Sequence, residues 1–494
     1  MSRELEVCSL LEANLSPKKV LEFIKKIEKI IEPHGIVMIK DGKKILDISW
    51  YPFVTNMPHV VNSVSKTFVA ITVGLCYDKK LLELDEKVVD IFPDVIINPN
   101  NKKIHNMTIK DVLTMSMGQM KNPVLDIDRD WVSALFNNPI TYEPGSMFHY
   151  DSLATFLLAA IVTRKSGEKV ITLLKREVFE PMSIKRAYFL ENNDGIAIGG
   201  LGLFISTEGL AKTGWMLTNK GKYNGKRILS EEWSVMMISK QIDNAPYFDV
   251  SKYESRAGYG FQCWKCQNGG TRMSGLWGQM CLMMPEYNFV MAINARGSSS
   301  QPMLDIFDNT VLPALQNSEK HPATEKDINE FEDYISKLSI DFTINDYKSG
   351  MPALINNKKV KVTNNPYGVE SFKVIFEGDL LLLKIIKKGK VYYAKYGHNK
   401  VLKSINNMYE LFPPYYDSLS KPKEKLFGFV HPNAYCQYHW ESETTAILEA
   451  IYDNEATRFN IMLIYDYNCA SFEWIPLNCF THYEHVYILG TYKD

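Results

Sequence analysis

The sequence lacks several features that would direct it to particular classes of protein. Its N-terminus has no apolar run that could serve as the h-region of a signal peptide. No stretch of about 18 apolar residues, the length of a membrane-spanning helix, occurs anywhere in the chain. Lysine and arginine (56) balance aspartate and glutamate (57), so no basic excess suggests a nucleic-acid partner. We therefore expect a cytoplasmic protein without a membrane span and without bound nucleic acid.

Cysteine is also sparse, with eight residues among 494. A disulfide scaffold would be denser in a shorter chain, so we expect reduced thiols. Cys263 and Cys266 form a lone CxxC, which could be half of a zinc site or a redox pair. No second CxxC accompanies it, and the surrounding YGFQCWKCQ favours a strand in which the two thiols face opposite sides. We predict no metal and no cofactor.

The first part of the chain has the pattern of an α+β domain. Ser16-Pro17 starts an amphipathic helix whose apolar residues recur as far as Ile31. Residues 35–48 then predict two strands joined at Asp41-Gly42. Helical patterns dominate as far as residue 240, and residues 255–295 return to strands. Strand sequences therefore bracket a helical insert, as expected for a sheet built from both ends of a domain.

A polar segment, residues 317–328, separates this part from a second one rich in strand patterns. We predict a first domain over residues 1–318, a linker with a short helix over 319–340, and a β-rich domain over 341–494. Short strands separated by turns predict a barrel or a sandwich in the second domain, at residues 371–377, 380–386, 391–396, 435–440, 445–452, 459–465 and 470–475.

Ser63 and Lys66 form an SxxK at the start of a helix that is apolar nearly all round. A spacing of three places both side chains on one helix face. A serine hydroxyl is a weak nucleophile until a base takes its proton, and lysine can act as that base only if its pKa is lowered, for example by burial. The same spacing recurs elsewhere in polar surroundings. A plainer interpretation of Ser63 and Lys66 is an N-cap serine followed by a snorkelling lysine.

Several segments in collinear order resemble the serine β-lactamase and penicillin-binding superfamily, in particular its class C-like branch with esterases and amide hydrolases. The resemblance covers roughly residues 30–315. It implies an antiparallel sheet flanked by helices, together with an all-helical subdomain. The segments that carry it are GIVMIKDGKKI, Ser63-Val-Ser-Lys66, LLELDEKVVDIFPD, MTIKDVLTMSMG, Glu143-Pro-Gly-Ser-Met-Phe-His-Tyr150-Asp-Ser152, Gly199-Gly200-Leu-Gly202 and KRILSEEW.

The resemblance implies a serine hydrolase that acts through an acyl-enzyme on an ester or amide, in a small molecule or a short peptide. Ser63 would be the nucleophile, and Lys66 and Tyr150 would move protons. We expect the neighbouring cation to ease deprotonation of Tyr150. The alternative for Tyr150 is a core aromatic with one satisfied hydroxyl. Ser152 stands where the family's second motif usually has asparagine.

The third motif of the family aligns with Met273-Ser274-Gly275, which makes the Leu276 N–H the second oxyanion donor beside that of Ser63. Met273 stands where a cation often binds the carboxylate of a penicillin or a D-alanyl peptide. Arg272 or Lys265 could compensate. Together with Ser152, this departure favours an esterase or amidase acting on an uncharged substrate.

Other interpretations remain open. The chain could be a catalytically silent penicillin-binding-like protein that only binds a ligand. We expect His149 to point away from Tyr150, and His59 to be a loop residue. Residues 341–494 resemble the lipocalin-like domains of some family members, on strand rhythm and the segment Asn365-Pro-Tyr-Gly-Val-Glu-Ser-Phe. Aromatic side chains there either line a ligand cavity or fill the core: Tyr435, Tyr438, Trp440 and Phe459.

Overall fold

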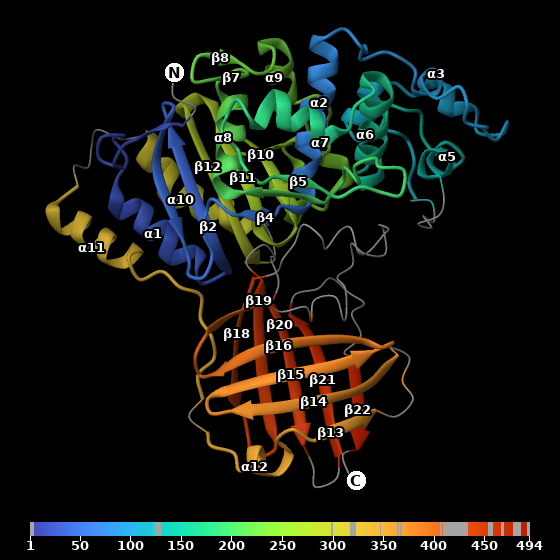
Figure 1. Cartoon of the computed structure of the whole chain (residues 1–494). Coiled ribbons are helices and arrows are strands. Elements are labelled where there is room, and N and C mark those ends of the chain that lie inside the picture. The colour runs from blue at the N-terminus through green and yellow to red at the C-terminus, as the bar shows by residue number, and fades with distance from the viewer. Residues whose placement is uncertain are drawn as a thin grey trace. The chain divides into compact units, whose positions relative to one another are not determined.

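The computed structural model describes residues 4–121, 123, 130–297, 300–316, 323–345, 347–362, 365, 368–405, 408, 433–452, 458–465, 469–477 and 486–491. The chain divides into two compact units, and the division falls between Ser339 and Ile340 (Figure 1). Each unit has its own sheet and its own core, so each is described by itself.

The first unit is built on a seven-stranded sheet, which is antiparallel except for the short strand β1 that pairs with β3 in parallel. The expected hairpin is confirmed, because β2 and β3 are joined at Asp41-Gly42, where both residues adopt left-handed backbone angles. In spatial order the strands are β1 (Glu6–Val7), β3 (Lys43–Ser49), β2 (Ile31–Lys40), β12 (Phe289–Gly297), β11 (Gln279–Met284), β10 (Thr271–Gly275) and β9 (Trp264–Lys265).

Helices cover both faces of this sheet (Figure 1). Successive side chains of a strand point to opposite faces. In β12, Phe289 meets the ring of Phe307 in α10 (Ser300–Gln316), whereas Val290 packs beside Gly214 in α8 (Thr207–Thr218). The helix α1 (Pro17–Ile27) lies on the α10 face, where the rings of Phe23 and Phe307 are in edge contact. The apolar strand runs are therefore buried on both sides.

The predicted extent of the first helix is wrong at its C-terminal end. Pro17 is at the first helical position as expected, but α1 ends at Ile27 and Ile31 already belongs to β2. Ile31 pairs with Gly297 of β12. Pairing with a distant strand therefore overrides the helical spacing of Ile30 and Ile31, which the sequence pattern alone could not reveal.

A group of helices accompanies the sheet, and it contains the segment with the SxxK. Ser63 lies in the 3-10 turn η1 (Asn62–Val64), one residue before the buried helix α2 (Ser65–Asp78). The other helices and 3-10 turns of the first unit are α3 (Val88–Ile91), η2 (Lys102–Asn106), α4 (Ile109–Leu113), α5 (Trp131–Phe136), α6 (Ser152–Ser166), α7 (Val170–Leu173), η3 (Leu174–Phe179), α9 (Glu231–Ile238), η4 (Ala245–Tyr247), η5 (Val250–Arg256), η6 (Leu276–Gly278), η7 (Pro285–Tyr287) and α11 (Glu325–Ile335).

Two small sheets complete the first unit. β4 (Pro58–Val60), β6 (Leu203–Ser206) and β5 (Tyr188–Phe189) form one, and β7 (Lys222–Tyr223) and β8 (Lys226–Arg227) form the other. None of the helices in the described part of the chain is long and apolar enough to cross a membrane.

The second unit is a closed barrel, one of the two architectures that the strand rhythm left open. Its sheet closes because β16 pairs with β18 in parallel. Tyr438 and Trp440 are buried in its hydrophobic core, as is usual for such aromatics, while the side chain of Phe459 and residues 366–367 lie outside the described residues. Its elements are α12 (Met351–Ile355), β13 (Lys359–Val362), β14 (Val369–Glu377), β15 (Leu380–Lys387), β16 (Lys390–His398), β17 (Leu402–Ile405), β18 (Asn433–Trp440), β19 (Thr445–Tyr452), β20 (Arg458–Tyr465), β21 (Cys469–Leu477) and β22 (Val486–Thr491).

Candidate active site

The structure brings Ser63 and Lys66 together where η1 passes into α2. The backbone turns sharply at Asn62, whose φ of 47° lies in the left-handed region that asparagine tolerates better than most residues. Lys66 is buried, with 1% of its surface exposed, and its Nζ lies 2.8 Å from Ser63 Oγ. Ser63 itself is only partly buried. A partly exposed hydroxyl therefore meets a buried amine.

Two further contacts hold the amine of Lys66. Its Nζ lies 3.1 Å from Ser152 Oγ, at the start of α6, and 2.5 Å from the carbonyl oxygen of Gly200. Burial lowers the pKa of Lys66 to about 7, and the nearby carboxylate of Asp151 acts in the opposite direction. Near neutral pH, a large fraction of Lys66 is therefore an uncharged amine, which can accept a proton from the serine hydroxyl.

Tyr150 converges on the same hydroxyl. Its side chain is hydrogen-bonded to Ser63, and the Lys66 Nζ lies 4.9 Å from the centre of its ring. Burial raises the pKa of Tyr150 to about 12, and the hydrogen bond with Ser63 offsets only part of that rise. The expectation of an easily deprotonated phenol is therefore wrong, because burial is the largest influence on the pKa of Tyr150. At neutral pH Tyr150 keeps its proton and can donate it.

The backbone on either side of Tyr150 is hydrogen-bonded to Met115. The His149 N–H donates to the Met115 carbonyl at 2.7 Å, and the Asp151 N–H meets the Met115 sulfur at 3.4 Å. The Asp151 side chain accepts from the Leu153 N–H at 2.8 Å and so caps α6. Our sequence reasoning passed over Asp151, although an aspartate directly before an apolar helix is a typical N-cap signal.

The predicted third motif also lies beside the nucleophile. A Cβ on Gly275 would meet the Val61 carbonyl oxygen at 2.2 Å and the Ser63 backbone nitrogen at 3.3 Å, so only glycine fits at this point of β10. The Asn62 side-chain amide donates to the Leu276 carbonyl at 3.0 Å. The backbones of η1 and η6 are thereby tied together, as the expected pair of oxyanion donors requires. Ser274 precedes this contact in β10 and is partly exposed.

Met273, which we expected among the substrate-binding residues because it lies in the third motif, is fully buried. Its side chain therefore cannot contact a substrate. In β10, Thr271, Arg272 and Met273 are buried, whereas Ser274 and Gly275 are partly exposed. The expected compensation also fails. Arg272 is 2% exposed and pairs with Glu254 and the Lys265 carbonyl. The Lys265 amine donates to the Ile238 carbonyl and to Thr271. Neither cation is available to bind a carboxylate.

The histidine expectations are met only in part. The ring of His149 meets Tyr247, and no contact of its side chain with Tyr150 is found among the described residues. His59, expected in a loop, lies in β4 and is buried against His34, with 2.8 Å between His34 Nδ1 and His59 Nε2. Pairing of β4 with β6 places it there. Among the described residues, no group of three or more histidine, cysteine or acidic side chains is arranged to hold a metal ion.

The two CxxC thiols have different neighbours. Cys263 Sγ lies 3.7 Å from Thr67 Oγ1 and Cys266 Sγ lies 3.4 Å from the Arg272 guanidinium. Both cysteines are free and buried.

An aromatic wall stands beside Tyr150. We use this name for Phe148, Tyr247, Phe248, Tyr259 and Trp264. The ring of Tyr150 lies 5.1 Å from that of Trp264 and 6.4 Å from that of Tyr259. Leu276, whose carbonyl accepts a hydrogen bond from the Asn62 side chain next to Ser63, is 38% exposed. The surroundings of the nucleophile are therefore mainly apolar and aromatic, a feature that single motifs did not reveal.

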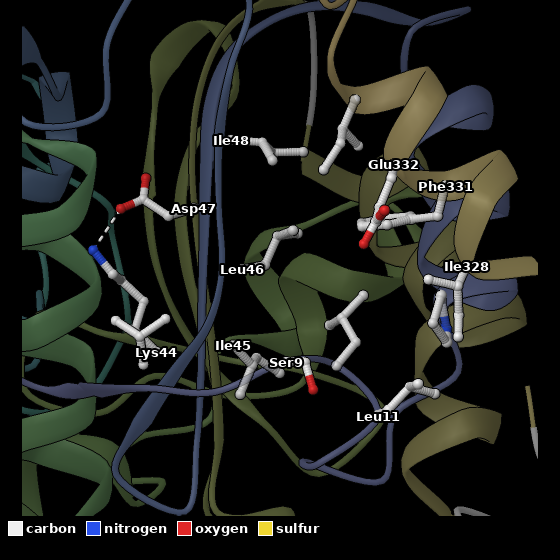
Figure 2. A pocket seen from close by; sticks show the side chains of 14 residues that line it. Ser9, Leu11, Lys44, Ile45, Leu46, Asp47, Ile48, Ile328, Phe331 and Glu332 are labelled. Atoms are coloured by element: carbon white, nitrogen blue, oxygen red, sulfur yellow. Dashed lines mark hydrogen bonds and ion pairs between the residues drawn. The ribbon is translucent and has the colours of Figure 1, made fainter. Parts of the chain in front are cut away.

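A separate cavity of about 330 Å³ lies between α11, β3 and the N-terminal segment. Figure 2 shows Leu46 and Ile48 facing Phe331 and Ile328 across it, whereas the side chains of Lys44 and Asp47 point away. Ser9 is the one serine in its lining, and its hydroxyl donates to Glu12 at 2.8 Å. The lining contains none of the residues that converge on Ser63.

Comparison with known proteins gives the family of the chain. The family model described as beta-lactamase matches residues 33–312, more than half of the chain. The chain therefore belongs to the beta-lactamase family. The fold of the first unit, an antiparallel sheet between helices with a helical group beside it, is that of this family. The closed barrel of the second unit is compatible, in general form, with the lipocalin-like domain expected there.

Solved structures share the fold at low sequence identity. A candidate beta-lactamase from Bacteroides dorei has a TM-score of 0.52 at 18% identity, over 60% of this chain and 98% of that one. A family VIII carboxylesterase has a TM-score of 0.50 at 15% identity, over 60% and 96%. A protein named SurE has a TM-score of 0.50 at 15% identity, over 78% and 94%. No curated protein matches the chain significantly.

Proposed function

We propose that the chain is a serine hydrolase that cleaves an ester or amide of a small, uncharged molecule through an acyl-enzyme on Ser63. The observation that carries this proposal is the convergence of the Lys66 amine and the Tyr150 phenol on the Ser63 hydroxyl. Membership of the beta-lactamase family supports it. The class C-like branch is the part of the family that we propose, because it uses a tyrosine at this place.

In the proposed first step, Ser63 Oγ attacks the substrate carbonyl carbon while its proton passes to the neutral amine of Lys66. The carbonyl oxygen becomes an oxyanion, which the backbone N–H groups of Ser63 and Leu276 would bind. Tyr150 then donates its phenolic proton to the leaving alcohol or amine, and Lys66 returns a proton to Tyr150. The bond to the leaving group breaks and an ester on Ser63 remains.

The second step reverses these roles. Water attacks the Ser63 ester, and its proton passes through Tyr150 and Lys66 back to Ser63 Oγ as the acid leaves. The Lys66 pKa of about 7 suits both directions, since the amine must take and give a proton near neutral pH. The raised pKa of Tyr150 makes its phenol a proton donor rather than a resident anion.

The substrate class follows from the groups around the site. The cation expected beside the third motif is replaced by buried Met273, and Arg272 and Lys265 have other partners. A substrate carboxylate would therefore lose its usual counter-ion. The aromatic wall and the exposed Leu276 favour an apolar or aromatic acyl or alkyl group instead. We propose an uncharged ester as the preferred substrate, ahead of a penicillin.

A second candidate is a silent relative that binds ligands without turnover. Ser152 favours it, because a single hydroxyl replaces the longer amide of the second motif and leaves fewer hydrogen bonds for an acyl amide. The intact Ser63, Lys66 and Tyr150 favour the enzyme.

Hydrolysis of p-nitrophenyl esters of increasing acyl length, compared with a chromogenic cephalosporin, tests the proposal. We expect ester hydrolysis by the wild-type chain and a loss of at least about 10³-fold in Ser63→Ala. We expect the cephalosporin to be a poorer substrate than the esters. Equal activity of the wild type and Ser63→Ala would refute the assignment of the nucleophile. Ester binding without any turnover by the wild type would favour the silent relative.

A further inference from the structure

Three separate segments of the chain supply the groups around Lys66. The nucleophile and the amine come from η1 and α2, Tyr150 and Ser152 come from the start of α6, and the Gly200 carbonyl comes from the loop before β6. Proton transfer depends on their mutual placement within tenths of an ångström, so a residue that fixes the segments to one another would control the chemistry without touching the substrate.

Gln262 makes such contacts. Its side chain is 2% exposed, and its Oε1 accepts a hydrogen bond from Thr155 Oγ1 at 2.7 Å. Its Nε2 donates to the carbonyl oxygens of Leu113, at 2.8 Å, and Val112, at 3.4 Å. Its own carbonyl oxygen accepts from Thr67 Oγ1 at 2.8 Å. One residue therefore bonds to α2, to α6 and to the end of α4.

Each of these partners is close to a part of the site. Thr67 directly follows Lys66, and Thr155 lies three residues after Ser152 on the same helix. The Thr155 carbonyl packs against Gly199, where a Cβ would come within 2.7 Å of it, so this turn of α6 also positions the Gly199-Gly200 loop.

The third partner is linked to Tyr150. Leu113 ends α4 two residues before Met115, whose carbonyl accepts from the His149 N–H. Gln262 is therefore connected to Lys66 through Thr67, to Ser152 through Thr155, and to Tyr150 through Leu113, Met115 and His149.

The backbone of Gln262 provides a second, independent observation. Its φ is 58°, in the left-handed region that non-glycine residues adopt only at some cost. Such conformations persist where surrounding contacts determine them, and they cluster near functional sites. Here the hydrogen bonds to Thr67, Thr155, Val112 and Leu113 supply those contacts.

We propose that Gln262 is the positioning residue of the active site, which holds α2, α6 and the Tyr150 segment in the register needed for proton exchange among Lys66, Tyr150 and Ser63. The expected change in kcat rests on the proposed function, because it can be seen only if the chain turns over a substrate. The effect of Gln262 on the placement of Lys66 can be measured without turnover.

The test compares Gln262→Met with Gln119→Met in the full chain. Methionine has nearly the volume of glutamine but cannot form the side-chain hydrogen bonds to Thr155, Val112 and Leu113, whereas the bond from Thr67 to the backbone carbonyl of residue 262 remains possible. Gln119 is a matched control, because it is also buried, at 3% exposure, and its amide donates to two carbonyls, those of Leu135 in α5 and of Asn138 just after it. Both variants lose buried hydrogen bonds, so both are expected to lose stability.

We expect Gln262→Met to lower kcat for a p-nitrophenyl ester by about tenfold to a hundredfold, with KM changed by less than about threefold. We expect Gln119→Met to keep kcat within about twofold when both proteins are folded by circular dichroism. Unchanged kcat in folded Gln262→Met would overturn the inference, as would an equal loss in Gln119→Met. If Gln262→Met does not fold, Thr155→Val, which removes only the hydroxyl bonded to Gln262, takes its place with the same expectation.

A second readout separates this inference from the proposed function. The titration of Lys66 can be followed by NMR of ¹³C-labelled lysine, with its signal assigned by its absence in Lys66→Arg. We expect the Lys66 midpoint to move by about half a pH unit or more in Gln262→Met and to stay in place in Gln119→Met. A moved midpoint in a protein that hydrolyses no ester would keep the positioning role and reject the hydrolase. An unmoved midpoint would reject the positioning role.

Discussion

Because the amine of Lys66 is buried, we can predict how the stability of the chain changes with pH, and this prediction can be tested without a substrate. In the folded chain burial holds the pKa of Lys66 at about 7, against 10.5 for an exposed lysine. Between these two values the unfolded chain binds a proton that the folded chain does not. The contribution of Lys66 to stability must therefore rise with pH across this interval, and it is lowest below pH 7, where the ammonium is buried.

The magnitude follows from the interval. The two pKa values are about 3.5 pH units apart, which corresponds to ~4.8 kcal/mol over the whole range. Between pH 7.5 and pH 9.5 the expected change is ~2.5 kcal/mol, because a small part of the folded population is still protonated at the lower pH. The perturbation is Lys66→Met, which removes the titrating group and keeps an unbranched apolar side chain.

The assay is urea unfolding of the wild type and of Lys66→Met at several pH values, followed by tryptophan fluorescence. We subtract the free energy of unfolding of the variant from that of the wild type. This removes the contribution of groups that titrate in the same way in both proteins. We expect the Lys66 difference to grow by ~2.5 kcal/mol between pH 7.5 and pH 9.5. If the difference between the wild type and Lys66→Met did not change with pH, Lys66 would keep its proton in the folded chain, and the prediction would be wrong.

Further predictions concern the reaction. For ester hydrolysis, kcat/KM should rise with pH through a midpoint of about 7 as Lys66 loses its proton, and a rate independent of pH from 5 to 9 would contradict Lys66 as the base. Ser152→Ala removes an acceptor of the Lys66 ammonium, so the midpoint in the pH–rate profile should move below that of the wild type. Tyr150→Phe keeps the ring but removes the phenolic proton, and steady-state kinetics should show a loss in kcat of about 10²- to 10⁴-fold. Gly275→Ala would push a Cβ against Val61 and the Ser63 nitrogen, so kcat should fall by about tenfold or more, while a wild-type rate would show that β10 does not contribute to the site.

The sequence was a good guide where local spacing decides the structure. Ser63 and Lys66 meet because three residues on a helical turn bring two side chains to one face, and the apolar residues that follow predict the burial of Lys66. The Asp41-Gly42 hairpin and the strand rhythm of the second unit are likewise local signals, and both are confirmed.

Properties that depend on distant contacts could not be predicted in this way. The pKa of Tyr150 is raised by burial beside the aromatic wall, whose members other than Phe148 come from segments about a hundred residues away. The burial of Met273 and the pairing of Arg272 with Glu254 were not predicted, because both depend on contacts that form only in the folded sheet. Gln262 has no motif at all, since its significance lies in the three elements to which it bonds.

We propose that Ser63 is the residue that becomes acylated, and covalent labelling can identify that residue. The wild-type chain is treated with a fluorophosphonate, digested, and analysed by peptide mass spectrometry, with Ser63→Ala and Lys66→Met in parallel. The account predicts one adduct on Ser63, none in Ser63→Ala, and a much slower reaction in Lys66→Met. An adduct on another serine, or an unreactive wild-type chain, would contradict it.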